Sequence, residues 1–256
     1  MDTGRIGFFT PIAAMEEGSG FAIGSPFHIA YLALSALLVC TLVITYRHLR
    51  PGIRGKTPRR IMLLCVSLTA TGLKMSELAI MMAWGVYNVF WWPLHPCNIC
   101  VLLCVLFAVV PNNPTGEVLY TLGIPGGMAG LLFADWIGRT TVVLNWFCLC
   151  GFVEHSLLVA FPLMTIAGGD FRPSMRRIWQ PLAFVALCAP PVRMFNTRFG
   201  TNYWFINKPS PGSPLETWAN LWGNPGYLIP FALLTLGIWI CMYLPWALSD
   251  RRRARH

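Results

Sequence analysis

The residues best suited to chemistry stand together at the start of an apolar segment, in the run WWPLHPCNIC at residues 91–100. Because proline is favoured at the first position of a helix, Pro96 predicts that Cys97 lies in the first helical turn. Backbone N–H groups without partners and the positive end of the helix dipole favour a thiolate there. Cys97 is therefore predicted to be a nucleophile, with a packed, unreactive cysteine as the alternative.

An imidazole and a carboxylate, Glu154 and His155, are adjacent inside a later apolar segment. Burying such groups in a membrane is costly unless they have partners or a function. One interpretation makes His155 the general base for a thiol on a neighbouring helix, since Cys–His pairs are defined by spatial geometry. The other is a histidine hydrogen-bonded to a backbone carbonyl. Adjacent helical side chains diverge by about 100 degrees, so Glu154 is not expected to orient His155.

Four further polar residues are candidates for binding or orienting a substrate. Lys74 and Glu77 are three residues apart in an apolar segment, so they can pair on one helix face. This pair would form either a polar wall for a lipid headgroup or a structural ion pair. Asn98 can stabilise an oxyanion, or serve in capping or helix packing. His95 precedes Pro96 and is expected to be extended, where it either lines the site or caps the next helix.

A long connection at residues 197–226 is rich in aromatic residues, prolines and glycines. Its length and composition favour an ordered lid with an aromatic belt at the outer membrane surface. Asn202, Tyr203 and Lys208 are candidate substrate-binding residues in this lid, and Lys208 is suited to meet a phosphate. An amphipathic loop resting at the headgroup level is the alternative.

The chain has 256 residues, of which 55% are hydrophobic and only 11% are charged, so it carries more apolar surface than a soluble domain buries. We therefore predict an all-α fold: one domain over residues 1–256, a polytopic membrane bundle of about seven transmembrane helices. The third and sixth are the weakest of the predicted spans, which cover residues 28–46, 61–86, 94–111, 117–135, 141–167, 178–196 and 226–247.

Arginine and lysine are distributed unevenly among the connections. With seven spans, the basic groups at residues 47–60, 172–177 and 251–255 all fall on one side. Because positive residues favour the cytoplasmic side, the N-terminus is predicted outside and the C-terminus inside. The net charge of +9 is attributed to this topology and to attraction to anionic lipid headgroups. Nucleic-acid binding is not expected, since no basic surface alternates with stacking aromatics.

These boundaries raise a geometric problem for the Cys–His pair. Cys97 is expected one turn from the outer surface, whereas His155 lies 14 residues after Thr141. That spacing corresponds to about 21 Å along a straight helix. For the side chains to meet, the fifth span must start further out, or the third must start as a sunken segment after Trp92.

Several of these motifs resemble a known family. The resemblance lies in Pro-Leu-His-x-Cys-Asn-Ile at residues 93–99, in the histidine of the fifth segment, and in Asn202-Tyr203 with Lys208-Pro209 ahead of Gly223 and Pro225. Together they resemble the YwaF-type bacterial integral membrane family, which is similar to the vertebrate transmembrane protein 164, a cysteine-dependent acyltransferase that remodels ether phospholipids. The resemblance implies a seven-helix bundle in which Cys97 accepts the acyl chain and His155 acts as its base.

The predicted function is acyl transfer between a phospholipid and a lysophospholipid through a thioester on Cys97. If water replaces the acceptor, the protein is a lipid hydrolase. Membrane lipids are the expected partners, the bacterial cytoplasmic membrane is the expected location, and no cofactor is expected.

Two other functions fit parts of the sequence. Cys97 and Cys100 form a Cys-x-x-Cys motif, with Cys148 and Cys150 as a second pair, which suits a membrane thiol oxidoreductase passing electrons to a quinone. A transporter or channel subunit would instead use the interior charged residues as an ion path. A metal site of His95, Cys97 and Cys100 is disfavoured because no fourth ligand is evident.

Overall fold

The structure is a computed structural model that describes residues 7–16, 18, 20–49, 58–138, 140–210 and 213–253. Within these ranges every regular element is helical and no strand occurs, which confirms the predicted all-α fold. The α-helices are α1 (Pro26–His48), α2 (Pro58–Ala83), α3 (Pro96–Val109), α4 (Asn113–Val118), α5 (Ile124–Leu132), α6 (Asp135–Gly138), α7 (Trp146–Gly168), α8 (Trp179–Phe199), α9 (Pro214–Trp222) and α10 (Leu228–Arg253). Shorter helical segments are η1 (Ile12–Ala14), η2 (Val89–Trp91), η3 (Leu119–Gly123), η4 (Met175–Arg177) and η5 (Tyr203–Phe205).

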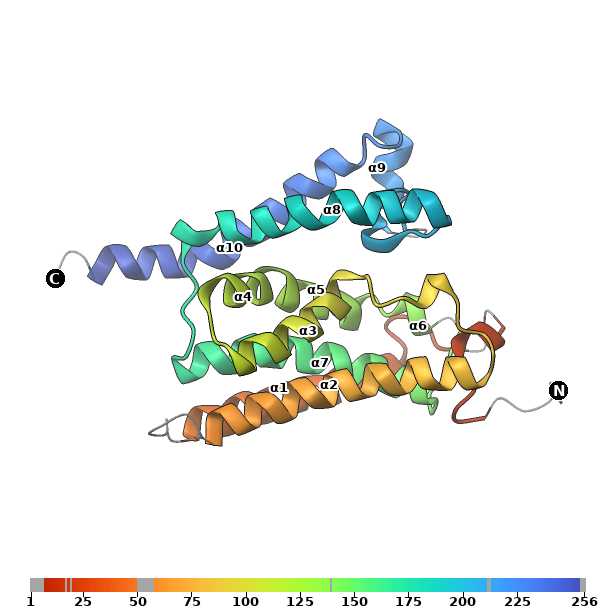
Figure 1. Ribbon diagram of the computed structural model, residues 1–256, viewed down its shortest axis with the longest axis horizontal. Helices are drawn as coiled ribbons and strands as arrows, with labels where there is room; N and C mark the ends of the chain where they lie inside the picture. Colours follow the sequence, from red (N-terminus) through yellow and green to blue (C-terminus); the bar gives the residue numbers. More distant parts are fainter. Residues whose placement is uncertain are drawn as a thin grey trace.

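The helices form three layers in the view of Figure 1, with α3, α4 and α5 in the middle. Helices α1, α2 and α7 lie on one side of this layer, and α8, α9 and α10 lie on the other. Helix α7 packs against α1, α2 and α5, and α3 packs against α2. In the most apolar part of α7, 78% of the residues are buried, compared with 11% in α1. Polar side chains of α7 therefore face protein and not lipid.

Five helical segments are long and apolar enough to cross a membrane: α1, α2, α7, Met175–Phe199 and α10. They correspond to five of the seven predicted spans. The predicted third span is the apolar helix α3, whose 14 residues reach only about 21 Å of the ~30 Å hydrocarbon core. The predicted fourth span is the interrupted run α4–η3–α5.

The interruption in the fourth segment is a π-helical turn, η3, where the Ile124 N–H donates to the Leu119 carbonyl five residues earlier. Pro125 explains it physically. Proline lacks an N–H, and its ring crowds the carbonyl four residues before it, here that of Thr121. A wider turn relieves this crowding, and such turns recur at functional sites in helical proteins.

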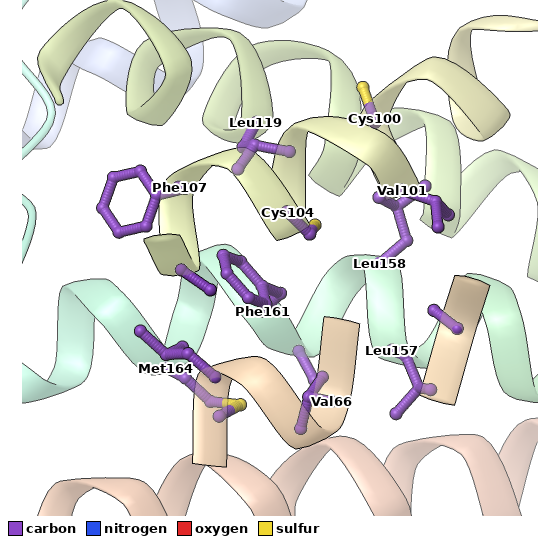
Figure 2. Close-up of a cluster of buried hydrophobic side chains, with 14 of the residues drawn as sticks. Val66, Cys100, Val101, Cys104, Phe107, Leu119, Leu157, Leu158, Phe161 and Met164 are labelled. Atoms are coloured by element: carbon purple, nitrogen blue, oxygen red, sulfur yellow. The ribbon is translucent and has the colours of Figure 1, made fainter. Parts of the chain in front are cut away.

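The hydrophobic core between α2, α3, η3 and α7 is closely packed. Figure 2 shows Val66, Val101, Phe107, Leu158 and Phe161 from these elements pointing toward one another. A second cluster surrounds Phe21, Tyr31 and Phe152. The two clusters share α7, which fixes this helix against its neighbours.

A buried carboxylate fastens the middle layer to α10 at the end opposite the start of α3. The Glu117 Oε1 atom accepts from Arg177 Nε (2.7 Å) and the Ser174 N–H (3.1 Å), and Oε2 accepts from the Tyr243 hydroxyl (2.5 Å). We call these four residues the Glu117 cluster. Glu117 is fully buried, and the sequence analysis did not identify it.

Candidate active site

His155 is held in one tautomer by its own helix. Its Nδ1 atom lies 2.7 Å from the Gly151 carbonyl oxygen in α7. Because a carbonyl only accepts, Nδ1 carries the proton and donates it, so Nε2 is the unprotonated nitrogen of the neutral ring. The backbone hydrogen bond expected of a structural histidine is thus present, and it also orients the ring as a base requires.

The ring of His155 lies against Gly130 of α5. A Cβ atom built on Gly130 would collide with the imidazole at Cδ2 and Nε2. Only a glycine therefore allows the ring to occupy this place. One turn earlier, the Cβ position of Gly126 lies 3.4 Å from the Cys97 sulfur.

Cys97 and His155 consequently face the same stripe of α5. Positions four apart on a helix have their Cβ atoms about 5–6 Å apart on one face. The thiol from α3 and the imidazole from α7 pack on neighbouring positions of this stripe, Gly126 and Gly130. The structure thus brings the two residues of the predicted pair to one place, although they are far apart in sequence.

Two features reduce the difference in membrane depth that the sequence predicted between Cys97 and His155. Helix α7 begins at Trp146 and not at Thr141, because Asn145 caps it and its amide donates to the carbonyls of Phe8 and Thr10. His155 is then nine residues along the helix, or about 14 Å. Helix α3 also begins well inside the end of α2, as Figure 1 shows.

Three ionisable side chains form a cluster beside the thiol. Lys74 Nζ lies 2.5 Å from Glu77 Oε2, as the spacing predicted, and 3.4 Å from Glu154 Oε2 on α7. We call these residues the Lys74 cluster. Lys74 lies on α2, which packs against both α3 and α7. The Glu154 Oε1 atom is buried and has no hydrogen-bond partner within the described part of the chain.

The surroundings of Cys97 work against a thiolate. The side chain packs against the hydrophobic core between α2, α3 and α7, and an apolar environment disfavours the charged form of a thiol. The start of a helix is then too weak to ionise it alone. A neighbouring base must take the proton if this sulfur is to act as a nucleophile.

The two other residues at the mouth of α3 differ in their contacts. His95 occupies the N-cap position, but its side chain makes no capping hydrogen bond. Its ring instead contacts Tyr203 and Phe205, with centroids 5.0 and 5.6 Å away. Asn98 makes no side-chain hydrogen bond within the described residues, so no contact orients its amide.

The segment around Tyr203 covers the approach to α3. The Tyr203 hydroxyl donates to the Val89 carbonyl (2.6 Å), and Trp204 Nε1 donates to the Leu94 carbonyl (2.7 Å). Burial raises the pKa of Tyr203 to about 12, so the hydroxyl remains a neutral donor. Trp204 and Phe205 both adopt positive φ angles, 62° and 53°, a strained backbone that surrounding contacts must hold in place.

Asn202 and Lys208 stabilise the same connection from its exposed side. The Asn202 amide donates to the Lys208 carbonyl (3.0 Å), and its oxygen accepts from the Lys208 N–H (3.1 Å). The Lys208 side chain is exposed to the surroundings. These contacts are local, and they do not bring Asn202 or Lys208 to Cys97.

Sequence reasoning missed Asn196 and the glycine stripe. Buried Asn196 accepts from the Tyr203 N–H and the Thr201 hydroxyl and donates to the Tyr203 carbonyl. Nothing in its sequence context marks it. Gly126 and Gly130 had a usable signal, since small residues four apart in an apolar segment indicate close helix packing.

The cysteines are arranged differently from a redox relay. All nine cysteines are described, and none forms a disulfide. Cys100 is fully buried, and Cys148 packs in the second cluster with Phe21 and Tyr31. Cys100 of the Cys-x-x-Cys motif and Cys148 of the second pair therefore lie in different hydrophobic clusters.

The fold and this interior define the class: a helical membrane protein that holds a thiol, an imidazole and an ion cluster between its helices. The chain belongs to the TMEM164 family, whose model matches residues 23–243. The matched region contains every candidate site residue named above. No curated protein and no solved structure matches the chain.

Proposed function

We propose that this protein is a cysteine-dependent acyltransferase that moves an acyl chain between phospholipids. The observation that carries the proposal is the placement of the Cys97 sulfur and the His155 ring on neighbouring positions of one face of α5. The family, and the acyltransferase activity that the sequence resemblance implies, support it. The apolar helices provide the membrane in which such substrates reside.

In the first half of the reaction, His155 Nε2 takes the proton of the Cys97 thiol. The sulfur then attacks the carbonyl carbon of a phospholipid ester. When the tetrahedral intermediate collapses, the ester C–O bond breaks, and the lysophospholipid leaves with the proton from His155. The acyl chain remains on Cys97 as a thioester.

In the second half, the hydroxyl of an acceptor lysophospholipid gives its proton to His155 and attacks the thioester. The C–S bond breaks, and the sulfur recovers the proton from His155. Backbone N–H groups at the start of α3 and the Asn98 amide are the candidate donors to the oxyanion in both halves. With water as acceptor, the same steps produce a fatty acid.

The proposed setting is the cytoplasmic membrane of a bacterium, with the N-terminus outside and the start of α3 toward the outer face. The excess of basic residues in the connections on the other side supports this orientation. Lysophospholipids and phospholipids in the outer leaflet would then reach Cys97 from that side.

The test is labelling of the full-length protein in lipid nanodiscs with an activated acyl-chain probe, read by mass spectrometry of modified residues. In the unmodified protein we expect an acyl thioester on Cys97, and in Cys97→Ser we expect none. In His155→Ala, which retains Cys97, labelling should be strongly reduced. Labelling that is independent of His155 would contradict the general-base role.

A matched control separates this proposal from thiol–disulfide exchange. Cys100→Ala removes the second thiol of the Cys-x-x-Cys motif but leaves the Cys97–His155 pair intact. Acyl labelling and transfer should survive this change, whereas exchange chemistry needs both thiols. Loss of transfer in Cys100→Ala would favour the oxidoreductase.

A further inference from the structure

The mechanism above leaves one buried acceptor in the site unused. The Glu154 side chain is 7% exposed, and its Oε1 atom has no hydrogen-bond partner within the described part of the chain. Burying a carboxylate oxygen without a donor costs free energy. An unpaired buried acceptor requires an explanation, and a donor on a bound ligand provides one.

The Lys74 cluster does not supply that donor. Lys74 is held more closely by Glu77 (2.5 Å) than by Glu154 (3.4 Å), and its contact with Glu154 is through Oε2. The cluster also contains two carboxylates for one ammonium. One carboxylate oxygen of the Lys74 cluster, Glu154 Oε1, can therefore accept a hydrogen bond from one further donor.

Glu154 lies close in the fold to the proposed Cys97–His155 pair. Glu154 contacts Lys74 of α2, whereas the ring of the adjacent His155 packs against Gly130 of α5. The Cys97 sulfur packs at Gly126 on the same face of α5, so Glu154 is the sequence neighbour of the base in the proposed Cys97–His155 pair. A molecule that reacts with a Cys97 thioester must bring its hydroxyl into this region.

We propose that Glu154 Oε1 binds the hydroxyl of the acyl acceptor, a lysophospholipid, as a hydrogen-bond acceptor. The inference rests on the proposed function and adds the group that recognises the second substrate. Glu154 takes part here as a binding group, and the proton of the hydroxyl is still taken by His155. Recognition of a hydroxyl by a carboxylate favours a lipid acceptor with a free hydroxyl over its fully substituted or deoxy counterpart.

The test is a binding measurement in which no chemistry occurs. Full-length protein carrying Cys97→Ala is placed in nanodiscs and titrated with a lysophospholipid and with its deoxy analogue, which has the same chain and headgroup. We expect the hydroxyl-bearing lipid to bind roughly tenfold more tightly, as a charge-assisted hydrogen bond allows. Addition of Glu154→Gln keeps an uncharged amide oxygen, which is a weaker acceptor, and should therefore reduce this difference.

Glu77→Gln is the matched control, because it removes the same charge from the same lysine and leaves Glu154 in place. If Lys74 geometry alone governed binding, Glu77→Gln would be the more damaging change, since Glu77 is the closer partner. The proposal expects the opposite order. Equal losses in the two variants, or no preference for the hydroxyl in the parent protein, would overturn it.

Two further arms identify the donor. Removing the ammonium charge of an ethanolamine headgroup by N-acetylation, at constant free hydroxyl, should leave the Glu154 effect unchanged. If the effect follows the ammonium instead, the hydroxyl assignment is wrong. Should Glu154→Gln fail to fold, Glu154→Asp shortens the side chain by one methylene, and it should weaken the preference for the hydroxyl.

Failure of the inference can be told apart from failure of the proposed function. Acyl labelling of Cys97 is read in the unmodified protein, because the first half-reaction needs no acceptor, and the hydroxyl preference is read separately in the Cys97→Ala background. If Cys97 is never labelled but the hydroxyl preference depends on Glu154, the binding site stands and the acyltransferase proposal falls. If labelling is normal and the preference is absent, only the role of Glu154 is refuted.

Discussion

The Glu117 cluster and the Lys74 cluster both bury carboxylates between helices, yet they satisfy them differently. Both oxygens of Glu117 accept hydrogen bonds, from Arg177, Ser174 and Tyr243. In the Lys74 cluster, Glu154 contacts the ammonium through Oε2 alone, and Oε1 has no partner within the described residues.

This difference separates two uses of buried charge. A carboxylate with every acceptor occupied fixes the geometry of the elements around it, here α4, η4 and α10. A carboxylate with a vacant acceptor contributes less to the fold and retains the capacity to bind a ligand. The predictions below test this division, beginning with the change of largest expected effect.

Glu117→Ala should lower the free energy of unfolding by about 3–5 kcal/mol, because it leaves Arg177 and Tyr243 without their buried partner. Denaturant unfolding in detergent micelles measures this change. Asp250→Ala is the control, since the Arg172–Asp250 ion pair is 50% exposed at Asp250 and should contribute less than about 1 kcal/mol. Similar small losses in both variants would contradict a structural role for the Glu117 cluster.

Gly130→Ala should reduce acyl labelling of Cys97 by roughly 100-fold, because the added methyl group displaces the His155 ring. The rate of labelling in nanodiscs measures the effect. Gly237→Ala on α10 is the matched control, since its added Cβ meets no heavy atom within 4 Å. Normal labelling in Gly130→Ala would show that the position of the ring on α5 is unimportant.

Tyr243→Phe should cost about 2 kcal/mol of unfolding free energy, since it removes a donor to a buried charged oxygen. Tyr227→Phe provides the comparison, because its hydroxyl donates to the neutral Phe205 carbonyl (2.6 Å) and its loss should cost about 1 kcal/mol. Denaturant unfolding of the two variants under one condition ranks them. The reverse order would count against the strong bond to Glu117.

Glu154→Leu should change the free energy of unfolding by less than about 1 kcal/mol, because it replaces a poorly satisfied buried carboxylate by an apolar group. Lys74 keeps its closer partner, Glu77. The same substitution at Glu117 should be strongly destabilising, and unfolding curves of the two variants compare them directly. A loss above 3 kcal/mol in Glu154→Leu would remove the distinction between the clusters.

Much of the fold was predictable because bilayer-spanning helices need long apolar runs. The predicted segments at 28–46, 61–86, 178–196 and 226–247 each correspond to a long apolar helix. The boundary at 141 was wrong, since hydropathy does not reveal that Asn145 caps α7. The sequence also did not indicate that the segment at 117–135 contains a π-helical turn, although Pro125 is its physical cause.

The candidate site was predictable only in part. The chemistry of Cys97 and His155 identified them from their own sequence neighbourhoods, and the helical period gave the Lys74–Glu77 pair. The third member of that cluster, Glu154, lies on another helix, so no spacing rule connects it. Gly130 and Asn196 act through shape and backbone contacts, which residue type alone does not signal.

The sequence by itself determined the helical membrane class, the candidate pair Cys97 and His155, and the start of α3 at Pro96, because these depend on composition and on neighbours within one turn. Only the tertiary structure decided that α5 presents two glycines to a thiol from α3 and an imidazole from α7. The same packing decided that Glu154 contacts Lys74 through Oε2, while its Oε1 atom has no hydrogen-bond partner among the residues that the structure describes. The physical reason is that helix–helix packing in a membrane depends on close steric fit between distant segments, which no single segment encodes.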